Sequence, residues 1–179
     1  MNVADVLTDA FGRVHDVVHD SVDGLTADQL AFRPDSEANS IAWLIWHLAR
    51  IQDDHVADAA NSQQLWTSAG WAKRFALPFA PSATGYGHGP GEVAAVKVES
   101  GELLTGYYDA VYQETITYVG RLAGTDLDRI VDESWDPPVT LGVRLVSVIS
   151  DCLQHAGQAR YLRGITERGR GQLSRRTLS

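Results

Sequence analysis

The sequence predicts an all-α fold, a four-helix bundle whose helices are joined by long crossing connections. Four segments of about 20 residues repeat apolar side chains at the i, i+3, i+4 spacing of an amphipathic helix. No stretch shows a convincing alternation of apolar and polar residues, as a half-buried strand would. The 179 residues, 44% of them hydrophobic, suffice for one domain with a sizeable core. We predict that this bundle spans residues 1–165 and that residues 166–179 form a basic, disordered tail.

The first half of the chain contains two of the four helices. Apolar positions over residues 3–25 form one stripe, which predicts the first long helix. A short helical turn is expected at residues 27–30. Asn39 or Ser40 is a suitable N-cap for the second long helix, residues 41–60, which is dense in tryptophan, leucine and isoleucine.

The second half contains the other two helices and the longest connection. Residues 61–91 have no helical period, but their aromatic side chains indicate that this connection packs against the bundle. The third helix is expected to begin at Glu92 or Ser100 and to end near Leu122. A proline-containing connection follows, and the fourth helix is expected over residues 140–165.

Charge and cysteine content restrict the classes of partner. The net charge is −8, while residues 163–179 alone carry +4, so the rest of the chain is strongly acidic and unsuited to nucleic acid. No apolar run is long enough to span a membrane, and no basic cluster at the N-terminus indicates a targeting peptide. A single cysteine, Cys152, fits a reducing compartment, so we expect a cytoplasmic protein.

Two further expectations come from composition. Thirteen arginines against two lysines, with abundant alanine and glycine, are typical of a high-GC genome such as an actinobacterial one. The strongly apolar helices are compatible with a homodimer, although no interface can be assigned from the sequence.

Three polar residues on apolar helix faces carry the chemical signal. Asp151 and His155 are four residues apart on the fourth helix, so their side chains lie on one face about 6 Å apart. Buried there, they must pair with each other or share a metal ion. His47 lies midway along the most apolar helix and can supply a third ligand. Three protein ligands with open positions are typical of catalytic zinc sites, and two histidines with a carboxylate also suit iron or nickel.

Two segments carry a family resemblance. Residues 31–58, AFRPDSEANSIAWLIWHLARIQDDHVAD, and residues 147–164, SVISDCLQHAGQARYLRG, resemble the metal-ligand helices of the DinB-like four-helix-bundle superfamily. Within it, the chain is most similar to the actinobacterial mycothiol-dependent branch, which includes mycothiol S-transferases and maleylpyruvate isomerase. The resemblance implies that His47, Asp151 and His155 are metal ligands, with Asp151 in place of the first histidine of the common pattern.

The resemblance also implies an activity and two cosubstrates. We expect a transferase that uses a divalent metal (zinc, nickel or iron) to activate a low-molecular-weight thiol, mycothiol, for attack on a small electrophile. Two alternatives stay open. One is a metal-dependent hydrolase of amidase type that uses a bound water and a separate base, for which Glu114 or Asp54 are candidates. The other is a non-catalytic, stress-linked bundle that binds a small molecule.

The remaining candidate residues have weaker signals. His88 lies in the glycine-rich run GYGHGPG, where the backbone can approach a ligand closely, and Trp43 precedes His47 by one turn. We take these two as candidate substrate-binding residues. His15 and His19 are expected to form a polar boundary on the first helix rather than a second metal site.

Overall fold

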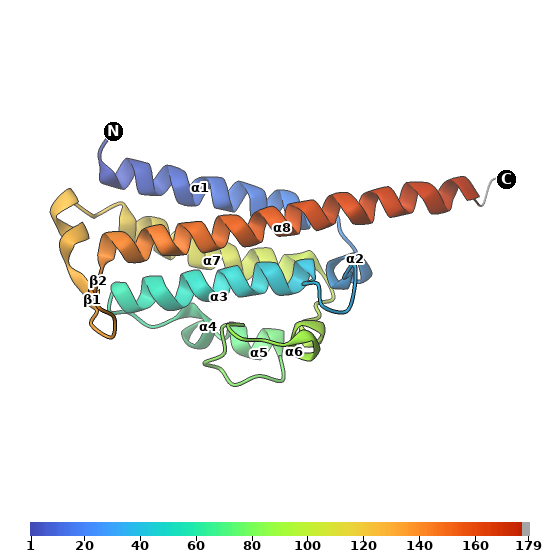
Figure 1. Cartoon of the computed structure of the whole chain (residues 1–179), viewed down its shortest axis with the longest axis horizontal. Helices are drawn as coiled ribbons and strands as arrows, with labels where there is room; N and C mark the ends of the chain where they lie inside the picture. The colour runs from blue at the N-terminus through green and yellow to red at the C-terminus, as the bar shows by residue number, and fades with distance from the viewer. Residues whose placement is uncertain (177–179) are drawn as a thin grey trace.

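The computed structural model describes the backbone of residues 1–176 and the side chains of residues 1–168. Within this part of the chain, α-helices dominate and the all-α prediction is confirmed (Figure 1). The elements in chain order are α1 Val3–Val22, α2 Ala27–Ala31, α3 Ile41–Ala59, α4 Leu65–Ser68, α5 Trp71–Phe75, α6 Pro90–Ala95, α7 Gly101–Val119, η1 Gly124–Asp128, β1 Ile130–Asp132, β2 Val139–Thr140 and α8 Leu141–Arg176.

The four long helices α1, α3, α7 and α8 form the bundle. Helix α8 packs along both α1 and α3, and α7 packs along the same two helices from the other side. The apolar stripes predicted from the sequence face inward, so that Phe11, Leu44, Tyr108 and Ala159, one from each helix, are fully buried. Ser40 caps α3 as predicted, because its hydroxyl accepts a hydrogen bond from the backbone N–H of Trp43.

The connection between α3 and α7 packs against the bundle, as its aromatic residues predicted. It contains the short helices α4, α5 and α6, and Trp66 and Phe75 are buried. Fully buried Arg50 of α3 holds this connection by donating to the carbonyl of Ala83. Asp53, one turn later, accepts hydrogen bonds from the first backbone N–H groups of α4. The connection is therefore fixed to α3, the helix that carries His47.

The structure corrects three details of the sequence analysis. β1 and β2 form a two-stranded antiparallel sheet, in which Ile130 is opposite Thr140, whereas no strand was expected. The strands of three and two residues are too short to show an alternation. Residues 61–91 contain two short helices. Helix α8 continues to Arg176 rather than ending near Ile165, since glycine weakens a helix by only about 1 kcal/mol without forbidding it.

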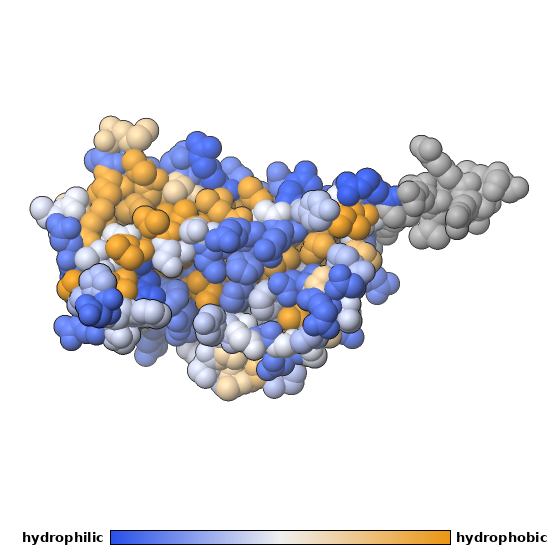
Figure 2. Space-filling view, in the orientation of Figure 1, coloured by the Kyte–Doolittle hydropathy of each residue, from blue (hydrophilic) through white to orange (hydrophobic). Residues whose placement is uncertain are grey.

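An apolar strip lies on one face of the bundle, over α1 and α8. Exposed Val143, Val146 and Leu153 of α8 and Val6 of α1 contribute to it, and Figure 2 shows the apolar colour running along these two helices.

Among residues 1–176, no helix has the length and apolarity needed to cross a membrane. Residues 166–176, the first part of the predicted basic tail, continue the backbone of α8, and residues 177–179 lie outside those described.

Candidate metal centre

The three residues predicted as ligands come together between α3 and α8. His47, Asp151 and His155 each present one ligand atom, and these atoms all lie within 4.8 Å of one another. The two imidazole rings meet edge to face with their centroids 4.6 Å apart. His47 is buried, whereas 33% of the Asp151 side chain is exposed, so the cluster is accessible from the α8 side.

Backbone carbonyl groups orient both imidazole rings. Nδ1 of His47 lies 2.6 Å from the carbonyl oxygen of Thr84, and Nδ1 of His155 lies 2.9 Å from that of Asp151. Because a carbonyl oxygen can only accept, each Nδ1 carries a ring hydrogen, so in the neutral form of each ring the free lone pair lies on Nε2. This is the arrangement in which a metal-binding histidine is held by a partner on its other nitrogen.

Gly85 makes the contact with Thr84 possible. Its φ is +97°, and a Cβ atom built on it would lie 2.6 Å from Nδ1 of His47. A side chain at this position would therefore collide with the imidazole ring. Gly85 is the first residue of the glycine-rich run that the sequence singled out, but its role in holding His47 could not be predicted.

The carboxylate of Asp151 is incompletely paired. Its Oδ2 atom is buried and has no hydrogen-bond partner, although Nδ1 of His155 is only 3.5 Å away. That nitrogen instead donates to the backbone carbonyl of the same aspartate. A buried carboxylate oxygen without a partner is energetically unfavourable, and a cation would satisfy it. Two imidazole nitrogens and one carboxylate oxygen suit zinc, nickel or iron, so the residues present fit such an ion.

The environment shifts the pKa values of all three groups. Burial lowers the pKa of His47, which favours the neutral form that binds metals. Burial alone would raise the pKa of Asp151, but the close approach and charge of the His155 imidazole outweigh it, so the pKa lies below its ordinary value. Burial alone would lower the pKa of His155, but its interactions with Asp151 outweigh it and raise the pKa. These shifts favour an ionised carboxylate on Asp151 and a neutral imidazole on His47.

The two candidate substrate-binding residues lie against the cluster. The Trp43 indole stacks on His47 at 4.6 Å between centroids and is 6.1 Å from the His155 ring. Its Nε1–H donates to Nδ1 of His88 at 3.3 Å, and His88 in turn stacks on Trp46. The aromatic side chains thus form a continuous wall from the cluster to the glycine-rich run.

The cluster does not include His55, Cys152, Asp54 or Glu114. Nδ1 of His55 is 3.2 Å from Nη1 of Arg144. Cys152 is fully buried, and burial raises the pKa of its thiol far above its ordinary value, which disfavours a nucleophilic role. Asp54 accepts a hydrogen bond from the side chain of Gln64, and Glu114 lines a different pocket, between α3 and α7.

The chain matches one family of known proteins over most of its length. The family model described as mycothiol S-transferase matches residues 6–168. The chain belongs to the mycothiol S-transferase family. This confirms the resemblance on which the predicted ligand set rests, and the matched range includes both helices of the cluster.

A solved structure supports the same placement at the level of the fold. The crystal structure of a conserved protein from Enterococcus faecalis is 33% identical in sequence and superimposes with a TM-score of 0.85. The alignment covers 91% of this chain and 96% of that protein. Among curated proteins, no sequence matches this chain.

Proposed function

We propose that the protein is a divalent-metal-dependent transferase that activates a low-molecular-weight thiol, mycothiol, for attack on a small electrophile. Membership of the mycothiol S-transferase family supports the reaction class and the thiol. The observation that carries the metal dependence is the buried Oδ2 of Asp151, which accepts no hydrogen bond and lies among the imidazole groups of His47 and His155. A cation satisfies all three groups at once.

His47, Asp151 and His155 would hold the cation. A free thiol has a pKa of about 8.5, so only a few per cent of it is thiolate at pH 7. A divalent ion at such a site would lower the pKa of a bound thiol and so favour the thiolate. The carbonyl of Thr84 keeps the hydrogen of His47 on Nδ1 and so keeps Nε2 available as a ligand atom. The backbone carbonyl of Asp151 does the same for His155.

The aromatic wall would position the cosubstrates. Trp43 covers one face of His47 and excludes water from it, while its indole N–H fixes the orientation of the His88 ring. Because Nδ1 of His88 accepts that hydrogen bond, Nε2 carries the ring hydrogen and can donate to a bound substrate. We assign the electrophile to this side of the cluster, next to Trp43 and His88.

A hydrolase on the same scaffold would need a separate general base near the cluster. The two carboxylates considered for this role, Asp54 and Glu114, are held at other positions. The arrangement therefore favours the thiol transferase over the amidase. In a bundle that binds a small molecule without a metal, Oδ2 of Asp151 would stay without a hydrogen-bond partner. A metal ion at the cluster would provide one ligand contact for that oxygen.

Two further proposals concern the location and the assembly of the protein. Its thiol cosubstrate needs a reducing compartment, which the single Cys152 also indicates, so we assign the protein to the cytoplasm. The apolar strip on α1 and α8 is the surface through which a homodimer would form.

The test is conjugation of mycothiol to monochlorobimane, measured by mass spectrometry with metal-free protein and after addition of zinc, nickel or iron. The proposal predicts metal-dependent conjugation that is lost in His47→Asn and kept in His55→Asn, a matched change on the same helix. Equal conjugation by the metal-free protein, or by His47→Asn, would contradict it. Turnover of amide conjugates without thiol would instead support the hydrolase.

A further inference from the structure

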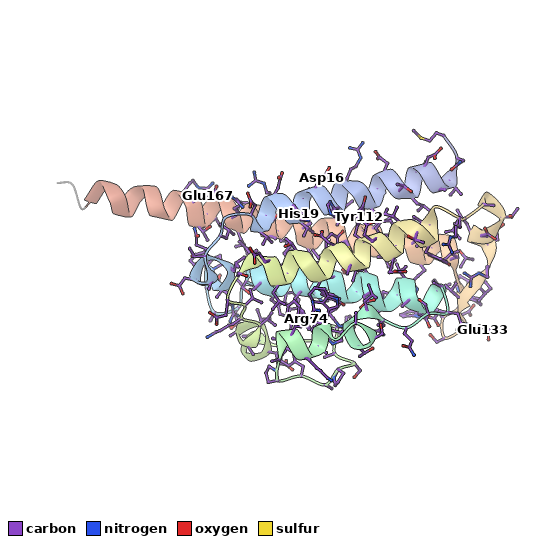
Figure 3. All side chains as sticks on the ribbon, turned by 180° about the vertical axis from the view of Figure 1, so that it is seen from behind. Asp16, His19, Arg74, Tyr112, Glu133 and Glu167 are labelled. Carbon is purple, nitrogen blue, oxygen red and sulfur yellow. The ribbon has the colours of Figure 1, made fainter. Side chains whose placement is uncertain are left out.

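A second group of metal-binding side chains lies on the opposite helix pair. His15 and His19 are one turn apart on α1, and both direct Nε2 toward the same oxygen, Oδ1 of Asp109 on α7. The two distances are 3.0 and 2.7 Å, and the imidazole centroids are 4.5 Å apart. Figure 3 shows His19 on α1 facing α7 close to Tyr112. Only a polar boundary was predicted here, since the two histidines flank the apolar stripe of α1; the carboxylate that completes the group comes from α7.

We propose that His15, His19 and Asp109 form a second site for a divalent transition-metal ion, which fastens α1 to α7. This inference does not depend on the proposed function, since the site shares no residue with the cluster between α3 and α8. One carboxylate and two imidazoles one turn apart on a helix form a donor set that favours zinc, cobalt or nickel over magnesium or calcium.

The spacing of the ligand atoms fits such an ion. Nitrogen and oxygen ligands bind zinc tetrahedrally at about 2.0–2.1 Å, which places any two of them about 3.3 Å apart. The distances from Asp109 Oδ1 to the two Nε2 atoms, 3.0 and 2.7 Å, are therefore about 0.3 and 0.6 Å shorter than a bound ion requires. Small side-chain movements would admit the ion without any change in the helices.

The surroundings favour a cation and let it reach the site. The exposed fractions of the His15, His19 and Asp109 side chains are 28%, 40% and 43%, so a hydrated ion can approach from solvent. Nδ1 of His15 lies 3.8 Å from a carboxylate oxygen of Asp16, which adds negative charge beside the site. The Tyr112 ring lies 4.3 Å from that of His15, between centroids, and restricts its rotation.

The alternative is that Asp109 only accepts hydrogen bonds from the two N–H groups. Metal binding to chelator-treated protein separates the two explanations. We predict that His19→Asn and Asp109→Asn each bind one fewer equivalent of Zn²⁺ than the unaltered protein, by equilibrium dialysis and elemental mass spectrometry. Asp20→Asn, which removes an exposed charge from the same helix, should bind as many equivalents as the unaltered protein.

A measurement without substitutions guards against variants that fail to fold. On titration with Ni²⁺ or Co²⁺, the ring resonances of His15 and His19 in the unaltered protein should broaden. Zn²⁺ should also raise the melting temperature of the unaltered protein by more than it raises that of His19→Asn. Unchanged ring resonances of His15 and His19 at saturating metal, or equal zinc content in His19→Asn and the unaltered protein, would overturn the second site.

Discussion

The contact between the glycine-rich run and His47 can be tested by Gly85→Ala. The positive φ of +97° disfavours any side chain, which costs about 1–2 kcal/mol. The new Cβ would lie 2.6 Å from His47 Nδ1, so the imidazole and the Thr84 carbonyl must separate and their hydrogen bond, worth about 1 kcal/mol, is weakened. We expect the free energy of unfolding to fall by about 2–4 kcal/mol. The affinity for metal should fall about 10–100-fold, as when other partners of metal-binding histidines are removed.

Gly87→Ala is the matched control. Gly87 also has a positive φ, +75°, but a Cβ there would meet nothing within 4 Å. It should show the backbone penalty alone, about 1–2 kcal/mol in urea unfolding, with unchanged metal affinity. The assays are urea denaturation of the metal-free proteins and competition with a chromophoric chelator. If Gly85→Ala binds metal as tightly as Gly87→Ala, the glycine does not position His47 and the reasoning fails.

Three other substitutions test the packing and the wall. Asp53→Ala leaves the charge of fully buried Arg50 without its carboxylate partner, so urea unfolding should show a loss of about 3–5 kcal/mol; a loss below 1 kcal/mol would contradict this. Trp43→Phe removes the N–H donor to His88 but keeps a ring over the cluster, so the KM for the electrophile should rise while metal content stays the same, and an unchanged KM would argue against the assigned wall. Cys152→Ala should keep conjugation activity, and the buried thiol should resist iodoacetamide in the native protein; inactivation by either change would assign the thiol a role in the reaction.

Helical periodicity predicted the parts of the fold and the site that depend on a single helix. The four long helices follow from their apolar stripes, and the pairing of Asp151 with His155 follows from their four-residue spacing. Placing His47 beside them required the family resemblance, because no local pattern determines how α3 and α8 are aligned. The structure brings these three residues together, and their role as metal ligands stays a prediction.

The contacts that the sequence could not predict cross between elements. The Thr84 carbonyl reaches His47 from 37 residues further along the chain, and Asp109 reaches the histidine pair of α1 from α7. Each contact depends on the path of a connection or on the packing of two helices. Buried Arg50 was missed for the same reason, since its partners come from the long connection and from α7.

The most direct test of the account is the metal content of the unaltered protein, purified without added metal or a histidine tag, beside His47→Ala and His155→Ala. Elemental mass spectrometry counts the equivalents of zinc, nickel and iron per chain. The account predicts that each variant contains one equivalent fewer than the unaltered protein and that neither conjugates mycothiol. An unaltered protein whose metal content and zinc uptake equal those of both variants would contradict the metal centre formed by His47, Asp151 and His155.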